Sequence, residues 1–208
     1  MLPITRGEVL FRDDRIDGML ARDISAKGVG RTFQHVQLLA GMSVIDNVAL
    51  GAHLRSSVGL SRASLRLDRA EEARLRHEAA LQLQRVGLGH YLFEQAGNLA
   101  LGQQRILEIA RALASDPVLL LLDEPAAGLR YKEKQALADV LRQLRAEGMS
   151  ILLVEHDMEF VMGLTDRLIV MDFGEKLAEG IPEEIQRDPR VLEEYRGGVE
   201  EVPAGARA

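Results

Sequence analysis

Two acidic residues, Asp123 and Glu124, end an apolar run that reads LLLL at positions 119–122. Ligands of α/β sheets bind at the carboxyl ends of buried parallel strands. Carboxylates placed there could hold Mg²⁺ and polarise a water molecule for attack on a phosphoryl group. An apolar run followed by Asp-Glu is a weak signal by itself, since a strand that ends in a solvated acidic turn gives the same pattern. The neighbouring motifs must decide between the two interpretations.

Three further motifs accompany this pair: RTFQ at 31–34, NLALGQQR at 98–105 and VEHD at 154–157. The second opens a helical pattern, so Gly102 would let backbone N–H groups approach an anion at the positive end of a helix dipole. Each motif also has an ordinary interpretation when it stands alone. Gln34 could be a polar loop residue, Gly102 a common helix start, and His156 a histidine satisfied at the end of a strand.

The order RTFQ, NLALGQQR, LLLLDEPAAGL and VEHD resembles the ATP-binding subunits of ABC transporters, as Q-loop, signature motif, Walker B with D-loop, and H-loop. The sequence of these segments is most similar to that of the branched-chain amino-acid importers, notably in RTFQHVQLLAGMSVIDNVALGAH and VEHDMEFVMGLTDRLIVMD. The resemblance runs from about Pro3 to Arg196. It implies an α/β fold at 1–196, an incomplete P-loop NTPase domain with a parallel core sheet. It also implies a helical signature subdomain at about 43–115, with a flexible tail at 197–208.

The resemblance assigns a role to each candidate residue, with ATP and Mg²⁺ as cofactors. Glu124 would orient the attacking water, and His156 would contact that water and the γ-phosphate. Asp123 would hold Mg²⁺ through water, while Gln34 would contact the metal or its water and relay the nucleotide state. The signature residues would pack on the γ-phosphate held by the other subunit; they are Leu99, Ala100, Leu101, Gly102 and Gln103.

The partners implied are a second ABC ATPase subunit, transmembrane permease subunits and, indirectly, a substrate-binding protein. The permease would dock near 36–54, although a buried helix face explains any one residue there equally well. The implied function is ATP-driven uptake of branched-chain or related amino acids at the cytoplasmic face of the membrane. A degenerate, non-enzymatic partner that offers only its signature motif in trans is the alternative. A DNA-repair or chromosome-organising ATPase would need sustained heptads and a basic stripe, which are missing here.

The sequence departs from the family pattern most clearly in what it lacks. The 208 residues contain no G-x-x-x-x-G-K-[ST], and KGVG at 27–30 has neither the spacing nor the hydroxyl. In the family this loop precedes the segment matched by 1–11. We therefore expect a truncated product, a fragment or a misassigned start, inactive by itself. Ala100 replaces a common serine at little expected cost, and the effect of Arg130, where Asp or Asn is usual, stays open.

Composition agrees with a water-soluble enzyme subunit. The net charge is −6, which favours no nucleic-acid partner. There is no cysteine, so disulfides and thiol chemistry are excluded. No signal segment is apparent, and the longest strongly apolar run is far too short to span a bilayer.

Helical and strand patterns alternate along the chain, as is typical of α/β domains. We expect 118–122 and 151–154 to be buried strands, and the loss of a neighbouring strand to expose apolar edges beside them and to lower solubility. Ser43 is the expected N-cap of one helix and Asp68 that of a longer one. Shorter strands are expected at 7–11, 167–171 and 176–178, and further helices at 102–113, 132–147, 158–164 and 183–195.

Overall fold

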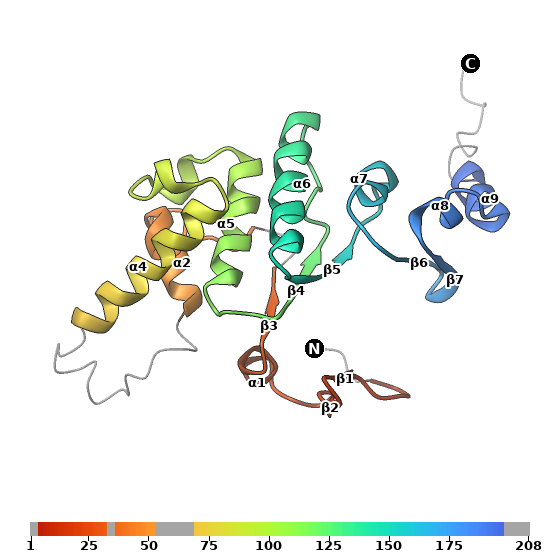
Figure 1. The fold of residues 1–208 in the computed structure, drawn as a ribbon, viewed down its shortest axis with the longest axis horizontal. Coiled ribbons are helices and arrows are strands. Elements are labelled where there is room, and N and C mark those ends of the chain that lie inside the picture. The colour runs from red at the N-terminus through yellow and green to blue at the C-terminus, as the bar shows by residue number, and fades with distance from the viewer. Residues whose placement is uncertain (1–3, 33–35, 53–68, 198–208) are drawn as a thin grey trace, which may run out of the picture. The chain divides into compact units, whose positions relative to one another are not determined.

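The computed structural model describes residues 4–32, 36–52 and 69–197. The chain forms two compact units, 1–156 and 157–208, which are treated separately below (Figure 1). The first unit contains the sheet with the acidic pair and the signature helix. The second begins directly after His156.

Three parallel strands form the sheet of the first unit, in the order β3 (Val29–Arg31), β4 (Leu119–Asp123) and β5 (Ser150–Val154). Leu120 and Leu122, which share one face of β4, are almost fully buried. The predicted parallel core sheet is therefore confirmed, with the acidic pair at the carboxyl end of its central strand.

Strand β5 is an edge strand within the described residues, where it pairs with β4 alone. Leu152 and Val154 are each 57% exposed. The prediction of a buried strand at 151–154 is wrong for the face of β5 that carries Leu152 and Val154. The strand predicted at 118–122 begins one residue later, and Val118 is 38% exposed, whereas Leu120 and Leu122 are buried.

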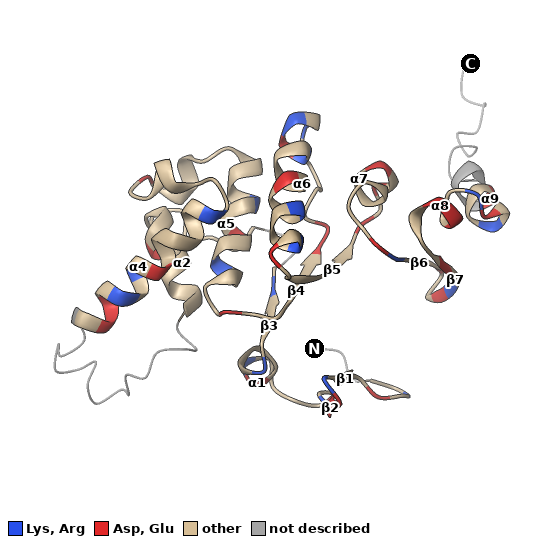
Figure 2. Ribbon diagram, viewed as in Figure 1, with Lys and Arg blue, Asp and Glu red and all other residues tan. Residues whose placement is uncertain are grey.

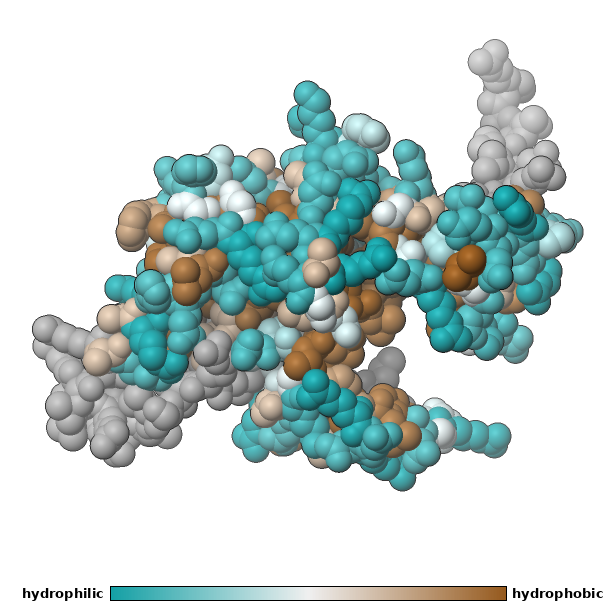
Figure 3. All heavy atoms as spheres, viewed as in Figure 1, coloured by the Kyte–Doolittle hydropathy of each residue, from teal (hydrophilic) through white to brown (hydrophobic). Residues whose placement is uncertain are grey.

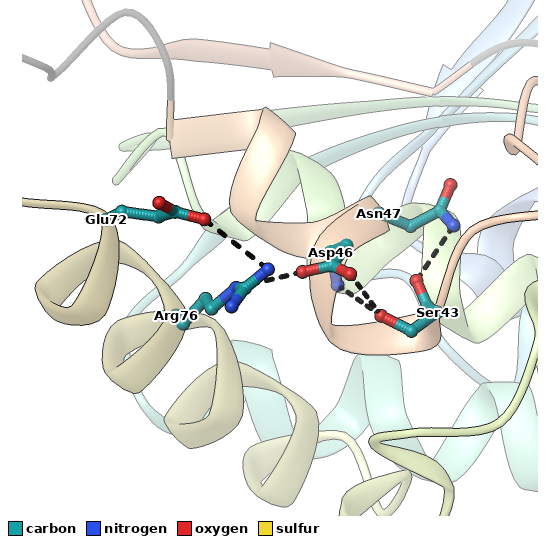
Figure 4. Close-up of polar contacts among 5 residues, drawn as sticks. All are labelled: Ser43, Asp46, Asn47, Glu72 and Arg76. Carbon is teal, nitrogen blue, oxygen red and sulfur yellow. Dashed lines mark hydrogen bonds and ion pairs between the residues drawn. The ribbon is translucent and has the colours of Figure 1, made fainter. Parts of the chain in front are cut away.

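Helices α2 (Val44–Gly51), α4 (Arg69–Arg85) and α5 (Leu101–Leu113) pack together beside the sheet (Figure 1). Two short 3₁₀ turns, at Gly89–Tyr91 and Ala96–Asn98, lie between α4 and α5. Ser43 is the predicted N-cap of α2, its Oγ accepting the Asp46 N–H at 3.2 Å. Arg76 of α4 reaches the same Asp46 at 3.0 Å and Glu72 at 3.4 Å (Figure 4). Asp68, the predicted cap of α4, lies outside the described residues.

The remaining elements of the first unit are helix α6, helix α1 and a small hairpin. Helix α6 (Tyr131–Ala146) packs its apolar stripe inward and meets α5. The strand predicted at 7–11 shrinks to β1 (Leu10–Phe11), which pairs antiparallel with β2 (Asp14–Arg15). Helix α1 (Ala21–Ala26) leads from the hairpin towards β3. A tight turn with positive φ at positions 12 and 13 joins β1 to β2.

The second unit contains α7 (Met158–Met162), the antiparallel hairpin β6 (Leu168–Asp172) and β7 (Glu175–Gly180), α8 (Pro182–Ile185) and α9 (Pro189–Gly197). Its core is formed by Ala178, Ile185 and Val191. The single helix predicted at 183–195 is wrong, because α8 ends at Ile185 and Pro189 begins a new helix. Gly197, assigned to the tail, is the last residue of α9; residues 198–208 lie outside the described part.

Surface charge is mixed. Figure 2 shows acidic and basic residues interspersed along α4 and α6, and the face drawn in Figure 3 is largely hydrophilic with apolar residues between. Among the described helices, none combines the length and the apolar character that crossing a bilayer requires. The boundaries of a helical subdomain at 43–115 remain a prediction.

Candidate functional site

Glu124 occupies a strained backbone position directly after β4. Its φ is +46°, in the left-handed region, where a residue other than glycine costs about 1–3 kcal/mol and clusters at functional sites. Its N–H donates to the carbonyl of Val154 at 2.9 Å, which extends the pairing of β4 and β5 by one residue. The sheet therefore fixes the backbone of this carboxylate although its conformation is unfavourable.

His156 meets Glu124 from the neighbouring strand end. Its Nδ1 lies 3.8 Å from Glu124 Oε1, with the histidine side chain 74% and the glutamate side chain 30% exposed. The contact is an ion pair only when the imidazole is protonated. Because β4 and β5 are adjacent and in parallel register, two residues from separate motifs lie together at one end of the sheet. Both stay accessible to a ligand.

Asp123 contacts Arg31, the last residue of β3. The guanidinium Nη2 lies 3.4 Å from Asp123 Oδ2, and the side chains are 52% and 40% exposed. Sequence reasoning gave Arg31 no role of its own; its signal was its place at the end of a strand within RTFQ. The contact brings a third strand end to the acidic pair.

The carboxylate oxygens at this site suit Mg²⁺ better than a metal ion that is bound by protein side chains alone. Mg²⁺ keeps several waters and takes one or two carboxylates together with phosphate oxygens. Asp123 is partly exposed and available for this, and among the described residues there is no group of three or more potential His, Cys, Asp or Glu ligands. Gln34, the other predicted metal contact, lies outside the described residues.

The signature residues begin α5. Ala100 is its N-cap residue, and its N–H donates to Gln103 Oε1 at 3.1 Å. Leu99 is buried, while Leu101 is 41% exposed. The predicted helix start is confirmed, and the contacts with γ-phosphate remain a prediction.

Gly102 is required by packing as well as by its predicted approach to phosphate. An added Cβ would lie 2.9 Å from Cβ of Glu133 on α6, closer than side chains tolerate. Glu133 Oε1 lies 3.4 Å from the Gly102 N–H, and Oε2 accepts the Arg130 N–H at 2.9 Å. One carboxylate therefore touches the first turns of both α5 and α6. Sequence reasoning missed Glu133, although its place three residues after Arg130 is typical of a capping residue.

Glu155 is a second contact that the sequence did not reveal. Its Oε1 accepts the N–H of Ala126 at 2.7 Å, joining the chain after β5 to the chain after β4. Together with the bond between Glu124 and Val154, this contact holds the two strand ends in place. The arrangement can position a carboxylate and an imidazole around a water molecule.

Comparison with known proteins agrees with the motifs. The family model "ABC transporter" matches residues 1–127, and "Branched-chain amino acid ATP-binding cassette transporter" matches residues 175–193. The high-affinity branched-chain amino acid transport ATP-binding protein LivG of Escherichia coli K12 is 42% identical over 196 residues, covering 93% of this chain and 77% of LivG. A probable LivG of Archaeoglobus fulgidus is 34% identical over 191 residues, covering 92% of this chain and 74% of its own.

Solved structures show the same relation. The ADP conformation of MJ1267, an ATP-binding cassette of an ABC transporter, matches with a TM-score of 0.81 and 30% identity over 94% of this chain and 79% of that one. A nucleotide-free ATP-binding cassette from an ABC transporter gives a TM-score of 0.77 at 29% identity, covering 93% and 78%. The chain belongs to the ATP-binding subunits of ABC transporters, among those of the branched-chain amino-acid type.

Proposed function

We propose that this chain is the nucleotide-binding subunit of an importer that couples ATP hydrolysis to the uptake of branched-chain or related amino acids at the cytoplasmic face of the membrane. The observation that carries the proposal is the 3.8 Å approach of Glu124 and His156 at the end of a parallel sheet, in a chain 42% identical to LivG. LivG is named for branched-chain amino-acid transport, which supports the substrate class.

Glu124 acts as the base in this proposal. Its carboxylate orients a water for attack on the γ-phosphate and accepts the proton, while His156 contacts the same water and the phosphate. The fixed backbone of Glu124 limits the carboxylate's movement, which favours a preorganised site. Asp123 would hold Mg²⁺ through water, and the ion would neutralise charge on the phosphate oxygens. Gln34 completes the proposed metal contacts.

The signature residues act on a nucleotide bound by a second ATP-binding subunit. The N-terminal turn of α5 presents backbone N–H groups and the positive end of a helix dipole, which suits a phosphate. Ala100 offers no hydroxyl, so the backbone supplies the contacts here. The partner subunit is a second copy or a related chain.

The permease is proposed to dock near 36–54. Two apolar side chains in this region, Leu39 and Leu50, are about half exposed, at 50% and 48%. Exposed leucines on a surface of mixed charge suit contact with a helix of another protein. The substrate-binding protein acts through the permease and does not touch this chain.

The alternative is a degenerate partner that contributes its signature motif in trans and hydrolyses nothing itself. Such a partner would act without a G-x-x-x-x-G-K-[ST] of its own, a motif that the 208 residues do not contain. Without that loop's N–H groups and lysine, the β- and γ-phosphates lose their contacts within the same chain.

ATPase measurements on two forms of the chain separate these proposals. The first form is the 208-residue chain, and the second carries a P-loop segment from a relative fused before it. The enzymatic proposal predicts hydrolysis by the fused form only, and its loss in Glu124→Gln. Glu94→Gln, which changes an exposed glutamate, is the matched control and should keep full activity.

Inactivity of the fused form, with signature-dependent stimulation of an intact subunit, would support the degenerate partner. Hydrolysis by the 208-residue chain that Glu124→Gln abolishes would contradict our interpretation of the missing loop. Leucine uptake by vesicles that contain the assembled importer would test the substrate class.

A further inference from the structure

Both backbone groups of Gln37 are bound by side chains of α5. The Gln37 N–H donates to Glu108 Oε1 at 2.7 Å, and Arg111 Nη1 donates to the Gln37 carbonyl at 2.5 Å. Glu108 and Arg111 are three residues apart and therefore neighbours on the helix surface. We call these two side chains the backbone clamp. It holds one residue of an otherwise irregular segment against the signature helix through both of its backbone groups.

Glu108 is an unusual residue for its surroundings, because its side chain is only 2% exposed. Burial raises the pKa of its carboxyl, whereas the bond from Gln37 and the charges of Arg105 and Arg111 oppose that rise. Arg105 Nη1 lies 3.6 Å from Glu108 Oε2, and Arg111 Nη2 lies 4.0 Å from Glu108 Oε1. Burying a carboxyl costs folding free energy compared with burying an apolar side chain of similar volume. The presence of Glu108 here therefore suggests that its carboxyl positions another group.

A second buried side chain binds the same segment two residues later. Asn47 of α2, which is fully buried, accepts the Leu39 N–H at 2.9 Å and donates to the Leu39 carbonyl at 3.1 Å. Its amide also donates to the carbonyl of Ser43 at 3.0 Å (Figure 4). The segment is therefore bound at Gln37 by α5 and at Leu39 by α2.

The N-terminal part of the RTFQ motif is bound to the sheet. The N–H of Thr32 donates to the carbonyl of Leu121 at 3.0 Å, two residues before Asp123. Residues 33–35 thus connect, along the chain, a point fixed to the strand of the acidic pair and a point fixed to the signature helix. Four residues, 33–36, separate these two points along the chain, and the clamp attaches the second point to α5.

We propose that Glu108 and Arg111 are positioning residues that couple the segment containing Gln34 to the signature helix. This inference rests on the proposed function and adds to it a mechanical link within one subunit. Neither residue touches nucleotide in this proposal. Removing the clamp is expected to leave hydrolysis possible while weakening its control by the permease.

Amide hydrogen exchange on the full chain tests whether the clamp exists. Glu108→Ala should raise the exchange rate of the Gln37 amide at least tenfold, and Glu108→Gln, which keeps an acceptor oxygen, should raise it much less. Leu107→Ala is the control, because Leu107 is fully buried on the same helix and makes no described contact with Gln37. It should raise exchange along α5 without selecting Gln37. An unchanged Gln37 rate in Glu108→Ala would overturn the clamp.

ATPase activity of the importer assembled with its permease and second ATP-binding subunit tests the coupling role. Glu108→Ala should reduce stimulation by the substrate-loaded binding protein at least fivefold, keep basal hydrolysis within twofold, and be rescued largely by Gln. An equal fall of basal and stimulated rates, as expected for Leu107→Ala, would show a structural role alone and overturn the coupling. If the unmodified assembly hydrolyses no ATP, the proposed function and the coupling both fail, and the exchange data still decide whether the clamp forms.

Discussion

Gly51, the last residue of α2, allows α2 and α5 to approach so closely that no side chain fits between them. A Cβ added at Gly51 would lie 1.9 Å from the carbonyl oxygen of Arg111. A carbon and a carbonyl oxygen normally stay about 3.3 Å or more apart. The two helices must therefore separate by about 1 Å or more in Gly51→Ala. The obstacle is a backbone atom, so no side-chain rotation relieves it.

The size of the effect follows from two opposing contributions. Overpacking of a tight contact costs about 1–3 kcal/mol, and a backbone obstacle places this case in the upper part of that range. Alanine is favoured over glycine within helices by about 0.5–1 kcal/mol, and less at the last residue of a helix. The net expectation is a loss of about 2 kcal/mol of unfolding free energy.

Gly41 provides the matched control. It has no atom within 4 Å of an added Cβ, and its φ lies outside the left-handed region. Gly41→Ala should therefore be neutral or stabilising by about 0.4–1 kcal/mol, because alanine restricts the unfolded chain. The urea concentration at the midpoint of unfolding should be measured by pulse proteolysis, because the chain is expected to have low solubility. A Gly51→Ala midpoint at or above that of the unmodified chain would refute the packing of α2 on α5, and with it the geometry that places Arg111 beside Gln37.

Three further predictions concern the sheet edge, the buried carboxyl and the buried amide. Leu152→Lys should raise solubility, measured by light scattering, because it places a charge on an exposed edge, whereas Leu120→Lys in the buried centre should cause aggregation. Because burial raises the folded pKa of Glu108, its stabilising contribution is complete below the ordinary value and is lost as pH rises through the raised one. Glu108→Gln should accordingly gain stability relative to the unmodified chain as pH rises through the weakly acidic range, and a pH-independent difference in urea midpoint would contradict this. Asn47→Ala should cost about 2–3 kcal/mol, since it leaves the buried backbone groups of Leu39 without their partners, and an unchanged urea midpoint would count against that contact.

The sequence predicted two of the three sheet strands, β4 and β5, and the long helices, because their signals are local, whereas β3 (Val29–Arg31) was not predicted. LLLL at 119–122 is a continuous apolar run of strand length, and the apolar residues of α6 recur with a helical period. Ser43 was identified as a cap because its side-chain chemistry and the following acidic residue form a local pattern. The pairing of Glu124 with His156 was expected from the order of the motifs, and the adjacent strand ends supply it.

What escaped prediction depends on contacts between distant parts of the chain. Gln37 and Glu108 are 71 residues apart, and neither residue type indicates that a buried carboxyl binds a peptide N–H. Glu133 was missed for the same reason, since its contact with Gly102 needs the packing of α6 on α5. The exposure of Leu152 could not be read from its own strand, because burial on one side depends on what lies beside β5.

Equilibrium binding of a labelled, non-hydrolysable ATP analogue tests the central claim most directly, namely that this chain's signature residues contact a nucleotide held by another subunit. The account predicts no saturable binding to the 208-residue chain alone, and one nucleotide per heterodimer when an intact ATP-binding subunit is added. That dimer should be lost in Leu101→Glu, which places a negative charge at an exposed signature position in the first turn of α5. Tight one-to-one binding of the analogue by monomers of this chain would contradict the account.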